Sequence, residues 1–213
     1  MKKIIITITT LLLALASFSQ SSAEAKSILD KAYSNFENSK GIKISFSFTA
    51  KEGKTIHHQQ DGMAMVKGNK FKIEMSNIHT WFDGKTQWVL MDDYDEVNIS
   101  EPTPEEVASI SPTALLSMYK SGFTLDAPTS QTILGMSSFV IDMKPTVSGT
   151  EFKDISVAID KQNYTIRQVT LTFKNGLTNN INVTEYNTNF NFNDADFVFN
   201  KTKHPGVEII DLR

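Results

Sequence analysis

The feature that most constrains this chain is an alternation of apolar and polar residues that begins at residue 42. Over residues 42–49, two isoleucines and two phenylalanines alternate with Lys, Ser, Ser and Thr. Successive side chains of a strand point to opposite faces of a sheet, so the pattern predicts a strand with one buried face. Further strands are predicted at residues 55–67, 70–75, 79–82, 86–91, 96–100, 123–126, 131–134, 138–144, 152–160, 164–174 and 177–186, with short pieces near 197–199 and 207–211.

Short turn signals separate these segments. Gly68-Asn69 and Asp83-Gly84 both stand between apolar-rich runs, and glycine tolerates the positive φ that a tight hairpin requires. Sequential hairpins at even spacing predict an antiparallel meander. A sheet of about eleven strands must curl, so we expect an open or half β-barrel.

One helix is predicted before the first strand. Residues 25–39 place Ile28, Leu29, Ala32, Tyr33 and Phe36 on a single face at helical spacing. Two short helices are predicted between the two groups of strands, where Thr103-Pro104 and Ser111-Pro112 each provide a capping residue before a proline. The expected fold is therefore mainly β (α+β), with the three helices on the concave side of the curled sheet or as a lid across its mouth. The interior is either filled by side chains or open to a ligand.

The N-terminus is predicted to be a secretory signal peptide. Lys2 and Lys3 precede an apolar stretch over residues 4–18, and small residues follow. Cleavage after Ser19, Ala23 or Ala25 is compatible with the pattern, and a retained N-terminal anchor is the less favoured alternative. We therefore expect residues 1–25 to be a signal peptide, residues 26–213 to form one domain, and the mature protein to be exported.

Composition and charge exclude several classes. The chain has no cysteine, so it lacks the residue that carries the lipid of a bacterial lipoprotein, and it cannot form disulfides. Its net charge of -3 argues against nucleic-acid binding and against broad electrostatic docking on anionic membranes.

No catalytic or metal site is indicated. His57 and His58 are adjacent, so on a strand they point to opposite faces and cannot bind one metal together. The acidic run at 92–96 lacks the glycine and the alternation of a calcium loop, and is interpreted as a solvated turn. No nucleophile, base and oxyanion donor are assembled, so we expect no enzyme, no cofactor and no metal. A hydrolase that uses either histidine is the disfavoured alternative.

The chain is rich in flexible and aromatic apolar residues. It contains 14 Phe, 8 Met and 2 Trp, more than one sheet face needs. These residues are compatible with a filled core or with a cavity for a hydrophobic ligand. Methionine suits the second possibility, because its flexible thioether adapts to varied apolar partners.

One stretch raises a specific question. In GMAMVKGNKFKIEM, residues 62–75, the odd-numbered positions carry Met63, Met65, Phe71 and Ile73, with Lys67 among them. Read as one face, this would be an apolar wall with a cation at its rim. The lysine either reaches the lid with its ammonium group or extends into solvent at a strand end.

Several stretches resemble the LolA family of periplasmic carriers of outer-membrane lipoproteins. They are GMAMVKGNKFKIEM from Gly62, WFDGKTQWVLMDDYDEV from Trp81, FVIDMKPTVSGTEFKDISVAIDKQNYTIRQVTLTFKNG from Phe139, and FVFNKTKHPGVEIID from Phe197. The likeness covers essentially the whole chain after the signal peptide. Each motif is weak alone, and their shared order and spacing make the resemblance specific.

The resemblance implies an open barrel whose cavity receives lipoprotein acyl chains. Such carriers take cargo from an ATP-driven releasing complex of the inner membrane (an ABC transporter), pass it to an outer-membrane acceptor, and hydrolyse nothing. Lys67 matches a basic residue, usually arginine, that bonds to the lid helices in the family. Lysine lacks the planar guanidinium group with which arginine makes paired hydrogen bonds. We therefore expect the lid of this protein to be held differently from that of its relatives. Gly68 stands where relatives often have proline, and Met143-Lys144-Pro145 inverts the usual Pro-Lys order.

The expected site follows from this reading. A monomer is expected, with Lys67 as the lid latch. A sensing module on the same half-barrel, as in envelope-stress regulators, is the alternative function. The residues expected to line the cavity or its lid are Phe46, Phe48, Met63, Met65, Phe71, Ile73, Trp88, Leu90, Ile110, Leu115 and Met118.

Overall fold

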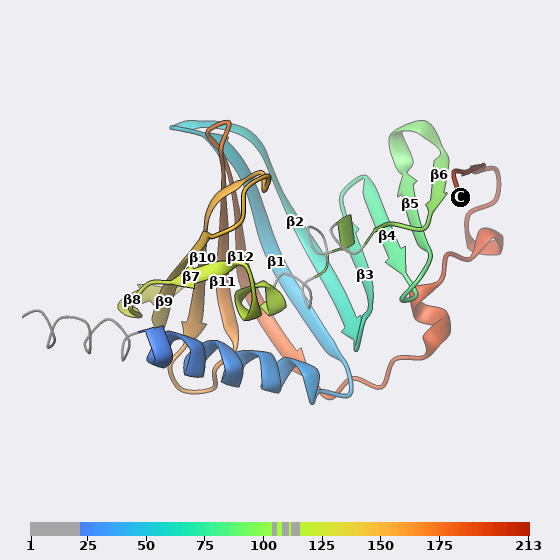
Figure 1. The fold of residues 1–213 in the computed structure, drawn as a ribbon. Coiled ribbons are helices and arrows are strands. Elements are labelled where there is room, and N and C mark those ends of the chain that lie inside the picture. Colours follow the sequence, from blue (N-terminus) through green and yellow to red (C-terminus); the bar gives the residue numbers. More distant parts are fainter. Residues whose placement is uncertain (1–21, 104–105, 108–110, 112–115) are drawn as a thin grey trace, which may run out of the picture.

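A single large twisted sheet carries most of the chain in the computed structural model, which describes residues 22–103, 106–107, 111 and 116–213 (Figure 1). Among these residues thirteen strands are present. Their bounds are β1 Ile42–Glu52, β2 Thr55–Lys67, β3 Lys70–Met75, β4 Ile78–Phe82, β5 Gln87–Met91, β6 Glu96–Ser100, β7 Phe123–Leu125, β8 Thr129–Ile133, β9 Met136–Pro145, β10 Phe152–Asp160, β11 Ile166–Phe173, β12 Leu177–Thr188 and β13 Glu208–Asp211.

The strand order agrees with the predicted meander. The sheet runs β13-β6-β5-β4-β3-β2-β1-β12-β11-β10-β9-β7, with β8 paired to β9. All neighbours are antiparallel except β13 and β6, which pair in parallel. The sheet is open, with β13 and β7 at its two ends. This confirms a mainly β, unclosed, half-barrel architecture.

The N-terminal helix defines the inner face of the sheet. Residues 22–37 are helical and lie across the strands from β9 to β1 (Figure 1). The buried side of the helix packs against side chains of the sheet in one apolar cluster, which includes Ile42, Val66 and Ile141. We call the side of the sheet that carries these residues the inner face. The buried residues of the helix are Ala25, Ile28, Leu29, Ala32 and Phe36.

The chain after β12 covers the other side of the sheet, which we call the outer face. Residues 189–207, the C-terminal arm, include the short 3-10 helices η3 (Asp194–Phe197) and η4 (Lys201–Lys203). Phe199 and Val207 of the arm pack on a second buried cluster. The buried members of that cluster are Trp81, Leu90 and Val97. This crossing brings β13 beside β6 in parallel, and it replaces the strand piece that the sequence predicted near 197–199.

The connection between β6 and β7, residues 101–122, is the part of the chain where the two lid helices were predicted. Its described parts are helical at 106–107 and 116–117, and end in the 3-10 helix η2 (Met118–Lys120). Thr103 is a capping residue as predicted, and it forms a reciprocal pair with Glu106: Thr103 N donates to Glu106 Oε2 at 2.7 Å and Glu106 N to Thr103 Oγ1 at 3.3 Å. Leu116 and Tyr119 are buried in the inner-face cluster. The rest of the predicted lid helices lies outside the described residues.

Candidate binding site

The register of β1 with its neighbours gives the inner face its apolar surface. Ile42 pairs with Val66, Ile44 with Ala64, and Phe46 with Gly62. Directly paired residues share a face, so Phe46 and Phe48 continue the row that starts in the core beneath the helix. The apolar row of β1 therefore continues past the closely packed core, where its side chains are only partly buried.

A strip of partly buried apolar side chains adjoins this core. Phe152 and Phe173 pair across β10 and β11 with ring centroids 5.3 Å apart. These side chains are packed against the core on one side and remain partly exposed on the other. The exposed part is an apolar surface to which a ligand can bind. The members that pack on the core are Phe46, Ile73, Phe152, Phe173 and Ile181, and we call them the inner strip.

Gly62 allows the ring of Phe46 to lie across the sheet. A Cβ atom added to Gly62 would be 2.5 Å from Phe46 Cζ and 2.8 Å from its Cε2. Such a contact is far shorter than any that carbon atoms make in packed proteins, so a larger residue here must displace the ring. The glycine therefore fixes the position of one member of the inner strip.

Met63 and Met65 lie on the outer face, and the expectation that they share a face with Phe71 and Ile73 is wrong. Gly68 and Asn69 form a two-residue hairpin turn in which Lys67 pairs with Lys70. Gly68 has φ +61°, as the first turn position of a type II′ hairpin requires. A turn of two residues reverses the relation between odd numbers and faces, so only Phe71 and Ile73 point inward.

Trp88 and Leu90 also lie on the outer face, contrary to expectation. Phe82 pairs with Gln87, which again exchanges odd and even positions between the faces. Leu90 is buried in the outer-face cluster, and Trp88 packs against it beneath the C-terminal arm. These two residues stabilise the attachment of the arm and do not border the inner strip.

Lys67 contacts the C-terminal arm. Its ammonium group donates to Phe192 O at 2.9 Å and to Asp194 Oδ1 at 3.0 Å, while Lys70 Nζ lies 2.9 Å from Asp194 Oδ2. The hydrogen bonds from Lys70 and Lys67 lower the pKa of the Asp194 carboxyl group. Because this contact is on the outer face, the geometry does not support Lys67 as a latch for the lid.

A different contact joins the connection 101–122 to the N-terminal helix. Tyr119 donates its hydroxyl hydrogen to Asp30 Oδ1 at 2.6 Å, and Lys26 Nζ lies 2.7 Å from Asp30 Oδ2. Lys120 Nζ lies 3.3 Å from the centroid of the Tyr33 ring. Burial, followed by the bond to Asp30, raises the pKa of Tyr119 above its ordinary value. These contacts fix the end of the connection beside the helix.

The predicted lid residues are only partly visible in this arrangement. Met118 packs against the inner-face core. Ile110 and Leu115 lie outside the described residues. A hollow of about 700 Å³ opens where the helix, η2 and β7 meet. Its lining includes Lys26, Tyr119, Phe123 and Leu125, so cationic and apolar groups face the same space.

The sequence reading missed three members of the inner strip. Phe152, Phe173 and Ile181 lie on strands that were predicted, but they were not among the expected site residues. For Phe173 and Ile181 the signal was the alternation in 164–174 and 177–186, which assigns one parity to each face. Phe152 differs in parity from the inward-facing residues of its strand, and a register shift between Phe152 and Asp154 brings it opposite Phe173. Only the pairing of β10, β11 and β12 shows that these residues approach Phe46 on the same side.

Within the described ranges, no group of three or more His, Cys, Asp or Glu side chains is arranged to hold a metal ion. His57 lies on β2 with its Nε2 3.6 Å from Glu52 Oε2, and the ring of His58 lies 6.2 Å from that of Phe48. In the same part of the chain, the helical segments lack the length and apolar character that a membrane-spanning helix needs.

Comparison with known proteins identifies the family. A sequence profile described as outer membrane lipoprotein carrier protein LolA matches residues 15–177, well over half of the chain. The chain belongs to the LolA family. Comparison with curated protein sequences gives no match. The matched range ends at the start of β12, so the C-terminal arm lies beyond the part that carries the LolA signal.

Solved structures with the LolA-like fold resemble the chain at low sequence identity. An uncharacterized conserved protein from Thermus thermophilus has a TM-score of 0.59 at 11% identity, covering 88% of this chain and 99% of the other. MucB has a TM-score of 0.50 at 13% identity, covering 84% of this chain and 64% of MucB. A LolA superfamily protein from Nitrosomonas europaea has a TM-score of 0.44 at 10% identity, covering 82% and 97%.

Proposed function

We propose that this protein is a carrier that binds the acyl chains of lipoproteins on the inner face of its half-barrel and moves them from the inner to the outer membrane. In this account it hydrolyses nothing and needs no cofactor. The proposed contacts are the inward-facing expected residues Phe46, Phe48, Ile73 and Met118, together with Phe152, Phe173 and Ile181. Phe71 also faces inward, but it is fully buried in the core and supports the surface from beneath.

One observation carries the proposal: the inner strip is apolar, only partly buried, and flanked by the helix and by described residues of the connection that pack on the same core, among them Val107 and Leu116. Each methylene group of an acyl chain that leaves water for such a surface contributes about 0.8 kcal/mol. A chain of lipid length therefore gains enough to offset the ordering of the protein around it. Aromatic side chains bind such a ligand through apolar contact area and not through directional hydrogen bonds. This kind of binding is compatible with lipoproteins that differ in sequence.

The family suggests the partners and the compartment. We propose that residues 1–21 contain a signal peptide and that cleavage follows Ser19. Ala25 is fully buried in the inner-face core, so cleavage after Ala23 or Ala25 would remove part of the packed helix. In this account the mature protein is a periplasmic monomer that receives lipoproteins from an inner-membrane ABC transporter and passes them to an outer-membrane acceptor.

A second function is favoured by the likeness to MucB, whose TM-score of 0.50 indicates a shared fold. The same inner face would then bind a lipid as a signal, and a partner protein would respond to the bound state. The two functions differ in what is bound in the cell: a carrier holds whole lipoproteins in transit, whereas a sensor holds a lipid without the attached protein.

The test is to purify the full-length product from the envelope of its own cells and identify what is bound. Organic extraction with mass spectrometry detects lipids, and proteomics after gentle cross-linking detects lipoproteins. Whole lipoproteins support the carrier, lipid alone supports the sensor, and neither would reject both. Displacement of an apolar dye by fatty acid, measured on the delipidated protein, gives the affinity of the inner face.

Matched variants separate the two faces of the sheet. Ile73→Asn places a polar group on the inner strip, and Met65→Asn makes a similar change on the outer face of the adjacent strand. The proposal predicts weaker dye and fatty-acid binding by the first variant and unchanged binding by the second.

A further inference from the structure

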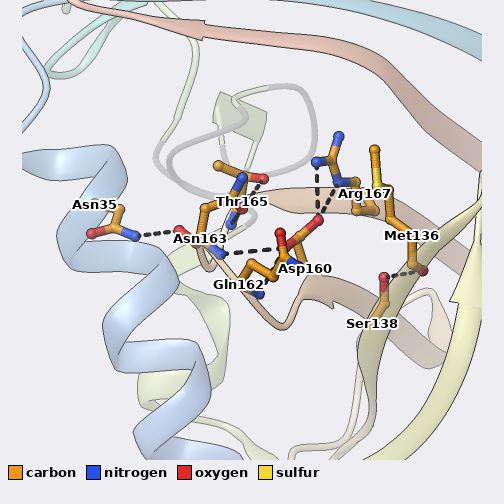
Figure 2. A network of polar contacts seen from close by, with 8 residues as sticks. All are labelled: Asn35, Met136, Ser138, Asp160, Gln162, Asn163, Thr165 and Arg167. Atoms are coloured by element: carbon orange, nitrogen blue, oxygen red, sulfur yellow. Dashed lines mark hydrogen bonds and ion pairs between the residues drawn. The ribbon is translucent and has the colours of Figure 1, made fainter.

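Two hairpin turns meet at one end of the sheet and expose apolar side chains to solvent. The β8–β9 turn contains Leu134 and Gly135, and Met136 follows it. The β10–β11 turn spans residues 161–165, and Lys161 N donates to Ser137 O at 3.0 Å, so the turns are adjacent. Figure 2 shows Met136 and Ser138 beside the residues of the second turn. We call this region the two-turn corner.

Leu134 is unfavourable at this position in two ways. Its φ of +49° lies in the left-handed region, followed by Gly135 at +79°, so the two residues form a type I′ turn that asparagine and glycine favour. The side chain is also 53% exposed, and Met136 is 48% exposed. Nothing lies within 4 Å of a Cβ atom added to Gly135, so the tip of the turn is open. An apolar residue that is both strained and exposed points to a contact outside the chain.

Aromatic and cationic side chains lie on the inner side of this corner, where Phe139 and Tyr164 pack on the edge of the inner-face core. Phe139 and Tyr164 stack with ring centroids 6.5 Å apart. Lys161 Nζ lies 4.8 Å from the Phe139 ring, and Lys31 Nζ lies 4.7 Å from the Tyr164 ring. Aromatic rings beside lysines are the composition of a water–membrane boundary, where each side chain keeps one end apolar and the other solvated.

The two lysines keep their charge available. The hydrogen-bond partners described for them are neutral: Ser130 Oγ for Lys161 at 2.6 Å and Tyr164 Oη for Lys31 at 3.2 Å. By contrast, Lys144 lies 2.6 Å from the carboxylate of Asp126. Neutral partners leave a positive potential at the corner that would attract lipid phosphates.

The corner is held in a fixed shape. Asp160 Oδ1 accepts hydrogen bonds from Gln162 N at 2.8 Å and Asn163 N at 3.2 Å, and its Oδ2 accepts from Arg167 Nε at 3.1 Å (Figure 2). Asn35 of the helix donates to Asn163 O at 2.9 Å. The carboxylate of Asp160 is thereby neutralised by Arg167, and the second turn is attached to the helix. A rigid turn loses little entropy when it docks.

We propose that the two-turn corner is a membrane-contacting surface, which inserts Leu134 and Met136 among lipid headgroups while Lys31 and Lys161 face the phosphates. The net charge of -3 opposes broad attachment, so the contact is local and reversible. Two apolar side chains at an open turn suit insertion into a bilayer better than binding of a peptide. This inference does not depend on the cargo, because vesicles without lipoprotein test it.

The absence of native cysteine allows a direct test on the full-length mature protein. An environment-sensitive dye is attached to Leu134→Cys, or to Val147→Cys as a control. Val147 is 60% exposed but follows the opposite end of β9. With vesicles of phosphatidylethanolamine and phosphatidylglycerol, we expect a blue shift and quenching by spin-labelled lipid only from the dye at position 134. Equal responses at both positions, or none at position 134, would overturn the proposal.

Leu134→Asn separates binding from folding. Asparagine tolerates the left-handed conformation, so this variant should melt at the same or a higher temperature than the parent. Its affinity for the same vesicles should fall about tenfold, because the buried leucine is lost. Val147→Asn should bind as the parent does. Undiminished binding by Leu134→Asn would exclude the corner as the membrane contact.

Discussion

Tyr119 and Asp30 are joined by a hydrogen bond of 2.6 Å that connects the end of η2 to the N-terminal helix. The tyrosine is almost completely buried, whereas the carboxylate also contacts Lys26 at its exposed side. The end of the connection 101–122 is thus secured to the helix by this bond. Movement of that end relative to the helix requires the bond to break.

Tyr119→Phe keeps the buried ring and removes the hydroxyl group. The free energy of unfolding should fall by about 1 kcal/mol, the net value of one hydrogen bond to a partly solvated acceptor. Urea unfolding measures the loss, and hydrogen exchange should show faster opening at residues 116–120. An unchanged free energy and unchanged exchange would mean that the bond does not hold the segment.

The same bond gives a pH dependence. The hydrogen bonds from Lys26 and Tyr119 lower the pKa of Asp30 below its ordinary value of 3.8. A lowered pKa in the folded state means that the stabilisation is complete above that ordinary value and is lost as the pH falls through the lowered one. The difference in stability between the parent and Tyr119→Phe should therefore shrink in acid. A difference that grows on acidification would contradict the assignment.

Lys67→Leu should loosen the C-terminal arm without affecting ligand release. The substitution removes the bonds to Phe192 O and Asp194, so limited proteolysis within 189–193 should become faster. Dissociation of a bound fatty acid should keep its rate, because these contacts are on the outer face. Faster dissociation with an intact arm would restore Lys67 as a latch.

Gly62→Ala should destabilise the protein by about 1–3 kcal/mol, because its Cβ would meet the Phe46 ring at 2.5 Å. A double-mutant cycle with Phe46→Ala identifies the cause. If the clash is responsible, the alanine substitution at Gly62 should cost much less once the ring has been removed. Additive effects of the two changes would place the cost elsewhere.

Arg167→Met should leave the Asp160 carboxylate buried without its cationic partner, which lies at 3.0 Å. Removing one member of a buried pair costs about 3 kcal/mol or more. Burial alone would raise the pKa of Asp160, but the bonds from Gln162 N and Arg167 outweigh it and lower that pKa. In the variant the pKa should rise, so the destabilisation measured by thermal unfolding should lessen in acid. An equal loss at all pH values would argue for lost packing alone.

The alternation of residues was sufficient to predict the strands and the open antiparallel sheet. Phe46 and Phe48 were also placed on the correct face, since they continue the row of Ile42 and Ile44 within one strand. The helix was found because its buried residues repeat at helical spacing. In each case the information lies within one element, where side-chain direction follows from local backbone geometry.

The face on which a side chain lies was predicted wrongly when the prediction extended across a turn. Met65 and Phe71 share odd numbers, yet the turn at Gly68 places them on opposite faces. Leu90 was expected to line the cavity, but it lies on the outer face, and nothing in the local sequence shows that the C-terminal arm covers it. The partner of Lys67 lies 127 positions away, a contact that depends on how the arm crosses the sheet.

The central claim is that acyl chains bind the inner face. The most direct measurement is photo-crosslinking in living cells with a photoreactive phenylalanine analogue at position 48 or 63. Phe48 and Met63 lie on neighbouring strands but on opposite faces. The account predicts crosslinks to lipoproteins from position 48 and not from position 63. Crosslinks from position 63 alone, or from neither position, would contradict it.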